Sequence, residues 1–391
     1  MGSMTKHSTS HSTSHSTSGG EPLRVLQCVN VMDRAGLETM LMNYYRHIDR
    51  TVVQFDFLVH RSRAGSYDEE IMDLGGKIYH APRLFPQNYL TYNTQISKLL
   101  RGVSYKIIHS HIDSMSVFPL RAAKKLGIPV RIAHSHSCSL DIDYRYPIKV
   151  VAKRLMPQHA TDYWACSEKA GKFLFRTIDA AELHVVKNAI DLRRFTHDEE
   201  GRRRTRETMG LDESQIAICQ IGRFAKVKNQ SFSIRILQKL LEYNQNVRLF
   251  LIGDGPLRSE ISDEATRRGL GSKVAFLGER TDIPELMNAM DAMLMPSLYE
   301  GVPVSLIEAQ SAGLWSIAST AVSEDAILTP CAVRLPLHAG EEAWASAVLE
   351  LATQPRFGDA GSMLRAKGYD ILTSSQQLQA KYLAMTNRGT R

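Results

Sequence analysis

Short apolar runs rich in β-branched residues alternate with amphipathic stretches along most of this chain, and the alternation occurs twice. In the first half it predicts helices such as 37–48 and 115–126 between strands at 23–29, 55–59, 106–109, 130–133 and 162–166. From residue 215 it predicts helices at 229–243, 257–268, 282–290 and 305–312 between strands at 216–221, 247–252, 274–277, 292–295 and 316–318. Because alternating strands and helices form parallel sheets with right-handed crossovers, we predict an α/β protein with two doubly wound domains.

The length of the chain agrees with this division, since 391 residues can form two domains, each with its own core. We expect an N-terminal domain over residues 21–190 and a C-terminal domain over 191–371, with the highly charged stretch 191–214 as a linker or domain edge. Ligands of such domains bind at the carboxyl ends of the strands, so a cleft between the two sheets is the predicted site. Residues 1–20 repeat the unit His-Ser-Thr-Ser three times and predict a disordered expression tag.

Composition excludes several classes of protein. No apolar run reaches the roughly 18 residues of a membrane-spanning helix, and no secretory pattern is present, so we expect a cytoplasmic protein. The five cysteines are scattered and never spaced C-x-x-C, which argues against a disulfide framework or a zinc site. The net charge of +7 is compatible with nucleic acid, an anionic membrane or phosphate-bearing ligands. No nucleic-acid module, P-loop, H-E-x-x-H or G-x-S-x-G motif is present, so no nucleic-acid partner is expected.

The sharpest motif is the segment 296–309, which reads PSLYEGVPVSLIEA. A strand ends at Pro296, and Pro303 is well placed for the first turn of the helix that follows. Glu300 is therefore expected on the loop that faces the cleft, with Glu308 one to two turns into the helix. A carboxylate offers two acceptor oxygens that suit the vicinal hydroxyls of a sugar or ribose. The alternative is a loop charge and a surface glutamate, which the strand–loop–helix order disfavours.

A basic segment, 222–229, follows the first strand of the second unit and precedes a helix. Arg223 offers a planar fork and Lys228 a point charge, and the helix start adds a positive dipole end, so the segment predicts a phosphate site. Read alone, it could also be a solvated basic turn. The later segment Gly253-Asp254-Gly255-Pro256 lacks the third glycine of a dinucleotide fingerprint and is better read as a tight turn near the cleft.

Histidines gather at two strand ends of the first unit, as His109 and His111 and as His134 and His136. Such H-x-H pairs can bind a metal ion, but no carboxylate accompanies them at a convincing spacing, and we favour a neutral histidine that hydrogen-bonds a sugar hydroxyl. The D-x-D at Asp141 and Asp143 is a further, weaker metal candidate. We predict no metal and no cofactor. The basic amphipathic segment 144–156 fits either contact with an anionic membrane or an ordinary solvated helix face.

Together, the spacing of Glu300 and Glu308, the pair Arg223 and Lys228, and the segment Asn188-Ala189-Ile190-Asp191 resemble the retaining glycosyltransferases of family 4. That family has the GT-B fold, with two Rossmann-like domains facing across a cleft, and the likeness is greatest to bacterial exopolysaccharide and capsule transferases. The resemblance covers residues 23 to about 385. It implies an N-terminal acceptor domain, a C-terminal donor domain and a final helix, 372–386, that crosses back onto the first domain.

The resemblance also implies roles for individual residues. Catalytic contacts would come from Glu300 to the donor sugar, from Arg223 and Lys228 to the diphosphate, and from His134 near the donor sugar. Glu308 would hold the ribose, Gly278 and Arg280 would meet the base, and backbone would approach the donor at Gly36, Gly301, Val302, Pro303 and Val304. His111 and His136 are further cleft candidates on the acceptor side. The chain departs from the family pattern where Ala35 and Trp315 replace a glycine and a proline, which bears on the detail of the phosphate contacts.

The function expected from these features is a retaining, metal-independent hexosyl transfer from a nucleotide-diphosphate sugar, with UDP favoured by the resemblance. The acceptor would be a saccharide or a lipid-linked saccharide used for exopolysaccharide or cell-surface glycan, with peripheral contact at the inner membrane face. Two alternatives stay open at this stage: a sugar-nucleotide epimerase of the same fold, and a non-catalytic protein that binds nucleotide sugars. A nicotinamide dehydrogenase is disfavoured by the incomplete glycine fingerprint.

Overall fold

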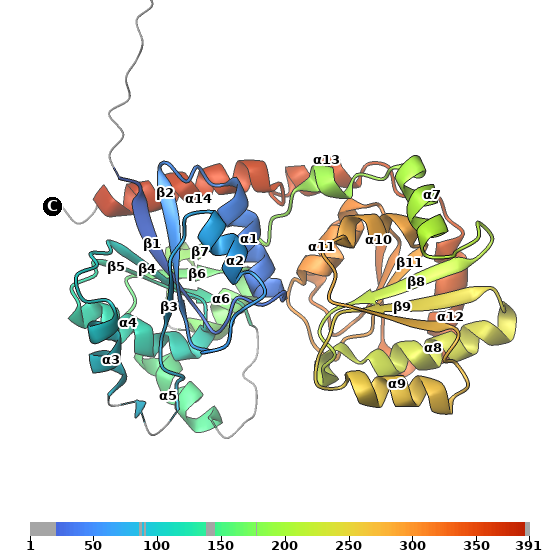
Figure 1. Ribbon diagram of the computed structural model, residues 1–391, viewed down its shortest axis with the longest axis horizontal. Helices are drawn as coiled ribbons and strands as arrows, with labels where there is room; N and C mark the ends of the chain where they lie inside the picture. The colour runs from blue at the N-terminus through green and yellow to red at the C-terminus, as the bar shows by residue number, and fades with distance from the viewer. Residues whose placement is uncertain (1–20, 86–87, 90, 138–144, 177, 388–391) are drawn as a thin grey trace, which may run out of the picture.

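The computed structural model describes residues 21–85, 88–89, 91–137, 145–176 and 178–387. Two α/β domains lie side by side, the first in blue and green and the second in yellow and orange (Figure 1). The expected tag at 1–20 and the D-x-D at Asp141 and Asp143 lie outside the described residues. No helix in the described part of the chain combines the length and the apolar character needed to span a membrane.

The first domain is built on a seven-stranded sheet with the order β3-β2-β1-β4-β5-β6-β7, and every adjacent pair of strands is parallel. Its strands are β1 (Leu23–Val29), β2 (Val53–Val59), β3 (Ile78–His80), β4 (Ile107–Ser110), β5 (Val130–Ser135), β6 (Asp162–Ala165) and β7 (Leu183–Val185). The chain reverses its direction of travel across the sheet between β3 and β4. This places the topological switch point between β1 and β4, where ligands bind in doubly wound folds.

The second domain repeats the plan on six parallel strands, with the order β10-β9-β8-β11-β12-β13. The strands are β8 (Ile216–Ile221), β9 (Val247–Ile252), β10 (Val274–Gly278), β11 (Ala292–Met295), β12 (Ser316–Ser319) and β13 (Ala332–Leu335). Here the switch point lies between β8 and β11. The predicted fold class, two Rossmann-like doubly wound domains, is confirmed.

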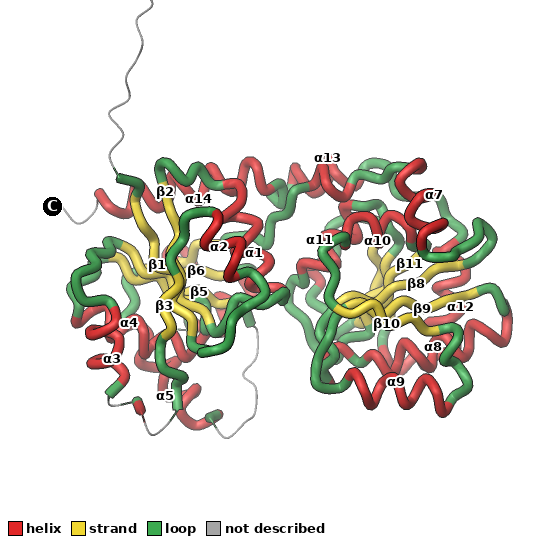
Figure 2. Tube along the Cα trace, in the orientation of Figure 1, coloured by secondary structure: helices red, strands yellow, loops and turns green. Residues whose placement is uncertain are grey.

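Helices cover both faces of each sheet, as Figure 2 shows in red around the yellow strands. In the first domain they are α1 (Gly36–His47), α2 (Asp68–Asp73), α3 (Tyr92–Leu99), α4 (Val117–Lys125), α5 (Tyr146–Leu155) and α6 (Glu168–Leu174). After these come α7 (Glu199–Thr208), α8 (Gln230–Tyr243), α9 (Arg258–Arg267), α10 (Ile283–Ala289), α11 (Val304–Ser311), α12 (Gly340–Ala352), α13 (Ala360–Ala366) and α14 (Ile371–Thr386). Because both faces of the sheets are covered, the strands are largely buried, and β2 is buried along its whole length.

The last helix, α14, runs along the first domain although it follows the second in sequence (Figure 1). Its Tyr382 is fully buried, stacks on Trp164 at a ring-centroid distance of 5.7 Å, and places its hydroxyl 2.7 Å from Nδ1 of His109. At the crossing, Ile190 N–H donates to the carbonyl of Tyr369, and Ile371 N–H donates back to Ile190, each at 3.0 Å. The two connections between the domains therefore run side by side.

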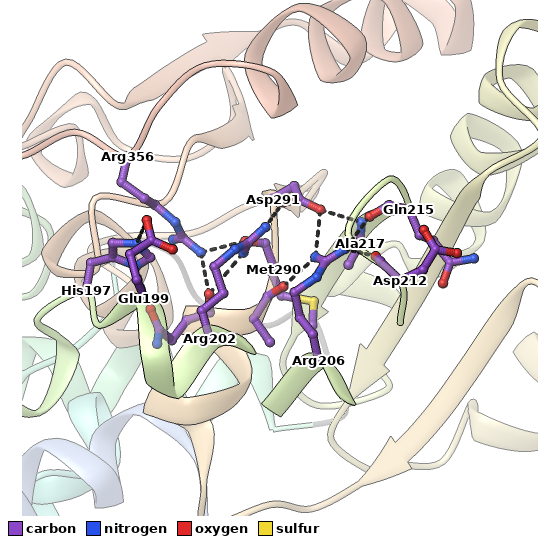
Figure 3. Close-up of polar contacts among 12 residues, drawn as sticks. His197, Glu199, Arg202, Arg206, Asp212, Gln215, Ala217, Met290, Asp291 and Arg356 are labelled. Carbon is purple, nitrogen blue, oxygen red and sulfur yellow. Dashed lines mark hydrogen bonds and ion pairs between the residues drawn. The ribbon is translucent and has the colours of Figure 1, made fainter. Parts of the chain in front are cut away.

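The charged stretch 191–214 is not an open linker, because it contains α7, which is held against the second domain by an arginine–aspartate cluster (Figure 3). Arg206 is buried, and its Nη1 donates to Asp291 Oδ2 at 3.2 Å and to the carbonyl of Ala289 at 3.0 Å. Arg202 forms a second ion pair with Asp291, and Ala217 N–H donates to the same carboxylate at 2.7 Å. Arg356 donates to three carbonyls at the end of α10. These bonds satisfy carbonyl groups at the end of α10 and hold α7 against β8 and β11.

Candidate active site

A cavity of about 490 Å³ opens between the two domains at the carboxyl ends of their strands. Among the residues predicted from the sequence, eight line this cavity: Gly36, His111, His136, Glu300, Gly301, Val302, Pro303 and Val304. Six others do not belong to its lining: His134, Arg223, Lys228, Gly278, Arg280 and Glu308. Residues of both domains therefore line the cavity, whereas six of the predicted residues lie outside its lining.

Close backbone contact between two loops positions Lys228 at the edge of the cavity. A Cβ on Gly253 would lie 2.3 Å from the carbonyl oxygen of Gly222, and a Cβ on Gly255 would lie 2.4 Å from that of Phe224. Gly222 has φ of +151° and would bring a Cβ within 3.1 Å of the Lys228 Cε atom. The glycines after β8 and β9 thus serve loop packing and the passage of the Lys228 side chain, which explains the tight turn predicted from the sequence.

Lys228 and Glu300, which are far apart in the sequence, form an ion pair in which Nζ lies 2.6 Å from Oε1. The two side chains are only 18% and 17% exposed, so the pair is partly shielded from water. Glu300 lies on the cavity wall, and the lysine is therefore held within reach of an anion placed there. Arg223 is exposed on the same loop as Lys228. One predicted cation, Lys228, thus meets the predicted carboxylate Glu300. The second predicted cation, Arg223, lies earlier on the same loop as Lys228.

Two carboxyl groups near the cleft have pKa values raised to about 7, and burial is the main cause in each. Glu308 lies in the second turn of α11, where the charge of Arg194 partly opposes the effect of burial on its pKa. Glu38 lies in the first turn of α1; the charge of Asp33 adds to its raised pKa, and that of Arg223 opposes it. Both groups change protonation state near neutral pH, which suits contacts to hydroxyl groups.

The loop that carries Glu300 is tied to the connection between the domains. Asn188 Nδ2 donates to the carbonyl oxygen of Val302 at 2.7 Å, and Asn188 itself lines the cavity. The Oδ1 atom of Asn188 is buried and has no hydrogen-bond partner in the part of the chain that the structure describes. Because an unpartnered buried acceptor is costly, this atom is poised to accept a hydrogen bond from a bound ligand.

The four predicted histidines form two parallel hydrogen-bonded pairs behind and along the cavity wall. His109 Nε2 lies 2.9 Å from His134 Nδ1, and His111 Nδ1 lies 3.0 Å from His136 Nε2. Rings also meet between the pairs: His134 and His136 stack with centroids 4.0 Å apart, and His109 and His111 lie tilted to one another with centroids 4.1 Å apart. Burial lowers the pKa of all four, that of His136 to about 3, so the rings are neutral.

Gln27 connects both pairs and sets the tautomers of His111 and His136. Its Nε2 donates to the Tyr382 hydroxyl at 3.3 Å, and its Oε1 lies 2.8 Å from Nε2 of His111. An amide oxygen only accepts, so neutral His111 carries its proton on Nε2 and accepts at Nδ1 from His136. His136 therefore keeps Nδ1 as an acceptor at the cavity wall. His134, two residues earlier in the chain, lies outside the cavity lining, and its buried Nε2 has no partner among the described residues.

A ligand atom from each of His109, His111 and His134 lies within 4.8 Å of the others, a separation that a metal ion can bridge. Here the ring nitrogens of His109 and His111 are engaged with His134, His136, Gln27 and Tyr382. The chemistry of this cluster is accordingly that of a neutral hydrogen-bonding network.

Sequence reasoning missed several residues of the first domain that line the cavity, namely Arg61, Arg83, Asp113, Lys149 and Asn30. Asp113 has φ of +47°, and its carboxylate accepts from His136 N–H at 2.8 Å and from the Ser137 hydroxyl at 2.9 Å. An aspartate in this strained conformation holds the loop after β5 in place. The sequence positions of Arg61 and Arg83 could have indicated a place at the cavity. Arg61 follows β2 and Arg83 follows β3, at the same sheet edge as the predicted histidines.

Gly278 and Arg280 follow β10 at the carboxyl edge of the second sheet. Gly278 has φ of +67°, with open space where a Cβ would lie, and its carbonyl accepts from Gly253 N–H at 2.8 Å. Arg280 is partly exposed and pairs with Asp282, with Nε 2.8 Å from Oδ1. Strand β10 is at the edge of the sheet, separated from β8 by β9, and neither residue lines the cavity.

The structure has two facing Rossmann-like domains. Gly36, at the start of α1, lines their shared cleft together with Glu300, which pairs with Lys228 and begins the E-x7-E segment. These features define the GT-B class of glycosyltransferases. Comparison with known proteins agrees. Residues 34–194 match the family described as Glycosyltransferase Family 4, and residues 201–355 match the one described as Glycosyl transferases group 1. The chain belongs to this glycosyltransferase family and is a transferase enzyme.

Among individual relatives, a Bacillus subtilis (strain 168) protein named as glycosyltransferase EpsF is 36% identical over 357 residues, which cover 89% of this chain and 93% of that protein. An Escherichia coli UDP-Gal:α-D-GlcNAc-diphosphoundecaprenol α-1,3-galactosyltransferase is 27% identical over 236 residues, 57% of this chain and 59% of that one. The solved structure of Anabaena Alr3699/HepE in complex with UDP and glucose has a TM-score of 0.76 at 18% identity, covering 93% of this chain and 99% of that one. At that identity the likeness concerns the fold.

Proposed function

We propose that this glycosyltransferase moves a sugar from a UDP-sugar donor, with retention of configuration, to a saccharide or lipid-linked acceptor used in bacterial exopolysaccharide or cell-surface glycan. The observation that carries the proposal is the Lys228–Glu300 pair at the interdomain cavity, facing the glycine-initiated helix α1. Relatives support the substrate classes, since one is named for a UDP-galactose donor and a diphosphoundecaprenol acceptor, and a structural neighbour is described in complex with UDP and glucose.

In this proposal the donor lies along the second domain. Lys228 and Arg223 bind the diphosphate, and the start of α8 directs backbone N–H groups toward the same place. Glu300 contacts hydroxyls of the donor sugar, and Glu308 binds the ribose. The remaining donor contacts are backbone or base contacts from Gly36, Gly278, Arg280, Gly301, Val302, Pro303 and Val304. No atom of the described residues would lie within 4 Å of a Cβ at Gly36, which leaves room for a ligand to approach that backbone.

The reaction breaks the bond between the anomeric carbon and the diphosphate oxygen and forms a bond from that carbon to the acceptor oxygen. Negative charge develops on the departing diphosphate, and Lys228 and Arg223 are oriented to oppose it before the bond breaks. The acceptor hydroxyl attacks from the face that the diphosphate leaves, and its proton passes to a diphosphate oxygen. His136 accepts a hydrogen bond from a sugar hydroxyl at Nδ1, and buried His134 supports the neighbouring ring. Domain closure excludes water.

The test is a panel of UDP-sugars incubated with lipid-linked and free saccharide acceptors, with release of UDP measured and the product examined by NMR. We expect UDP release that depends on the acceptor, and a new glycosidic linkage with the anomeric configuration of the donor. An inverted linkage would contradict the retaining step. Consumption of donor without acceptor, with formation of an epimeric sugar, would instead indicate an epimerase.

Contact with an anionic membrane is a further part of the proposal, through α5. This helix exposes Tyr146, Val151 and Leu155, with 40%, 48% and 38% of their surfaces accessible, beside the cations Lys153 and Arg154. Apolar side chains flanked by basic ones suit the interface of an anionic bilayer. We expect sedimentation with phosphatidylglycerol vesicles but not with neutral phosphatidylcholine vesicles. Equal recovery with both would remove this part of the proposal.

A further inference from the structure

Six side chains form one hydrogen-bonded network on the first-domain side of the cavity, and two of them, His111 and His136, line it. The tyrosine chain of this network contains Tyr382, His109 and His134, the histidine chain contains His111 and His136, and Gln27 joins the two chains. The four histidine rings are neutral because burial lowers the pKa of each. The place of each ring proton is therefore set by the hydrogen bonds that the ring makes.

Gln27 on β1 is the junction of the network. Its Nε2 donates to the Tyr382 hydroxyl at 3.3 Å, and its Oε1 lies 2.8 Å from Nε2 of His111. The nitrogen of an amide side chain only donates hydrogen bonds, and its oxygen only accepts them. The two chains of hydrogen bonds that leave Gln27 therefore start with opposite polarity.

The tyrosine chain has one arrangement of protons that uses every contact. The Tyr382 hydroxyl is buried, and its hydrogen-bond partners among the described residues are Gln27 Nε2 and, at 2.7 Å, His109 Nδ1. Because Gln27 donates to the hydroxyl oxygen, the hydroxyl hydrogen is donated to His109 Nδ1. Neutral His109 then carries its proton on Nε2 and donates to His134 Nδ1, which is 2.9 Å away. The tyrosine chain therefore ends in a proton donor, Nε2–H of His134.

The histidine chain runs with the opposite polarity. Gln27 Oε1 accepts from Nε2–H of His111, so neutral His111 accepts at Nδ1 from Nε2–H of His136, which is 3.0 Å away. His136 is then a bare acceptor at Nδ1, and it lines the cavity. Turning the Gln27 amide over would exchange its donor and acceptor ends and reverse both chains together. One end of the network therefore accepts a hydrogen bond whenever the other end donates one.

Packing holds the Tyr382 ring so that its hydroxyl stays at the network. The ring stacks on Trp164 at a centroid distance of 5.7 Å and meets Phe55 edge to face at 6.0 Å. Trp164 also packs edge to face against His109, with centroids 4.8 Å apart. Gln27 and His109 are register partners on the adjacent strands β1 and β4. Hydrogen bonding at the cavity wall is therefore connected to a side chain of α14, which follows the second domain in sequence.

From these contacts we propose that Gln27 and Tyr382 are positioning residues of the sugar site, which fix the histidine tautomers so that the cavity wall offers an acceptor at His136. Neither positioning residue lines the cavity, and both act through the rings. This inference rests on the proposed function and deepens it, because it states what the wall selects. A sugar hydroxyl donates a hydrogen bond to His136 Nδ1, whereas a fluorine at the same place has no proton to donate.

Nitrogen chemical shifts of the histidine side chains test the tautomers without relying on activity, because they separate a ring nitrogen that carries a proton from a bare one. The full chain is labelled with ¹⁵N at histidine, and the four resonances are assigned by single substitutions. In the wild type we expect the proton on Nε2 and a bare Nδ1 in every ring of the network.

Three variants locate the groups that fix these protons. Q27M removes both polar contacts at the junction and should leave the histidine chain with mixed tautomers. Y382F removes the hydroxyl and should do the same to the tyrosine chain. Y45F is the matched control, because Tyr45 is another buried tyrosine of the first domain and its hydroxyl donates to the carbonyl of Leu74, outside the network. It should keep the wild-type tautomers.

A binding comparison tests what the wall selects. UDP-glucose and its monodeoxyfluoro analogues are titrated by calorimetry into the wild type, Q27M and Y45F, and the ratio of the affinity for UDP-glucose to that for each analogue is the readout. At one position of the sugar, the ratio should favour the hydroxyl by at least about threefold in the wild type and in Y45F, and should fall toward one in Q27M. A merely loosened fold would weaken all ligands together and leave the ratio unchanged.

Several outcomes would overturn the inference. Wild-type tautomers retained in Q27M and Y382F show that neither residue positions the rings. A proton on Nδ1 of His136 in the wild type shows that the wall donates instead of accepting. Affinity ratios that are equal in the wild type and Q27M at every position of the sugar show that the acceptor selects no hydroxyl. If the wild type neither binds nor transfers any UDP-sugar, the proposed function fails, yet the nitrogen shifts still decide whether Gln27 and Tyr382 fix the tautomers.

Discussion

Replacing Glu308 with glutamine should make the protein more stable, and the gain should grow with pH. Burial raises the pKa of Glu308 from its ordinary value of 4.5 to about 7. Between these values the folded protein holds a proton that the unfolded chain has released, so the stability of the wild type falls as pH rises through this window. Glutamine has the same shape as the protonated acid and carries no charge to bury at higher pH.

The size of the effect follows from the pKa shift. A shift of about 2.5 units, the difference between 7 and 4.5, is worth about 3.4 kcal/mol when fully expressed. Part of the cost is already present at pH 5, so the gain from E308Q should be about 2.5 kcal/mol larger at pH 8 than at pH 5. Glu38, whose pKa is also raised to about 7, is present in both proteins, and its titration cancels in the comparison.

Urea unfolding of the wild type, E308Q and E285Q at pH 5 and pH 8 measures this difference. Glu285 is an exposed glutamate in the first turn of α10, so E285Q removes the same charge without burial and should show little change with pH. If Glu308 binds ribose hydroxyls as a carboxylate, UDP-glucose affinity of the wild type should rise with pH through 7 and that of E308Q should not. Equal stability gains for E308Q at both pH values would refute the reasoning.

Four other substitutions test three separate parts of the structure. R223A or K228A should lower kcat by about 10²–10³, since removal of one group that opposes charge in the transition state costs roughly 2.7–4 kcal/mol; near-normal turnover with saturating donor would contradict charge stabilisation. D291N should lower the free energy of unfolding by about 3 kcal/mol, because it weakens two arginine pairs of α7, one of them buried, and an unchanged urea midpoint would contradict that role. Y382F removes the hydroxyl that bonds His109 and should cost about 1–2 kcal/mol in thermal unfolding, whereas no loss would show that α14 is held by packing alone.

The fold was largely predictable because the long central strands carry an unambiguous pattern. β1, β2, β8 and β9 have six or seven residues each and are largely buried. The edge strands β3, β7 and β13 have only three or four residues, and their side chains are mostly half-buried or exposed, so no apolar run marks them. The stretch 191–214 was expected as a linker or domain edge because it is highly charged. Its charges alone do not reveal that Arg202 and Arg206 bond backbone carbonyls and Asp291.

The site was predictable where function lies in a contiguous motif and not where it depends on strand order. Glu300 and the residues to Val304 form one segment, and the structure places them on the cavity wall. Lys228 was assigned to phosphate, but its pairing with Glu300 depends on β8 and β11 being neighbours in the sheet. Arg61 and Arg83 follow strands whose adjacency no local pattern reveals. His136 rather than His134 lines the cavity, because alternate residues at a strand end differ in depth.

A crystal structure of the protein with bound UDP-glucose tests the central claim most directly, that cations and carboxylates of the second domain act on one diphosphate-linked ligand in the interdomain cavity. We predict diphosphate oxygens within hydrogen-bond distance of Lys228 Nζ and the Arg223 guanidinium, the ribose hydroxyls at Glu308, and the glucose beside Glu300. A nucleotide bound elsewhere, or one whose diphosphate contacts neither Lys228 nor Arg223, would contradict the account.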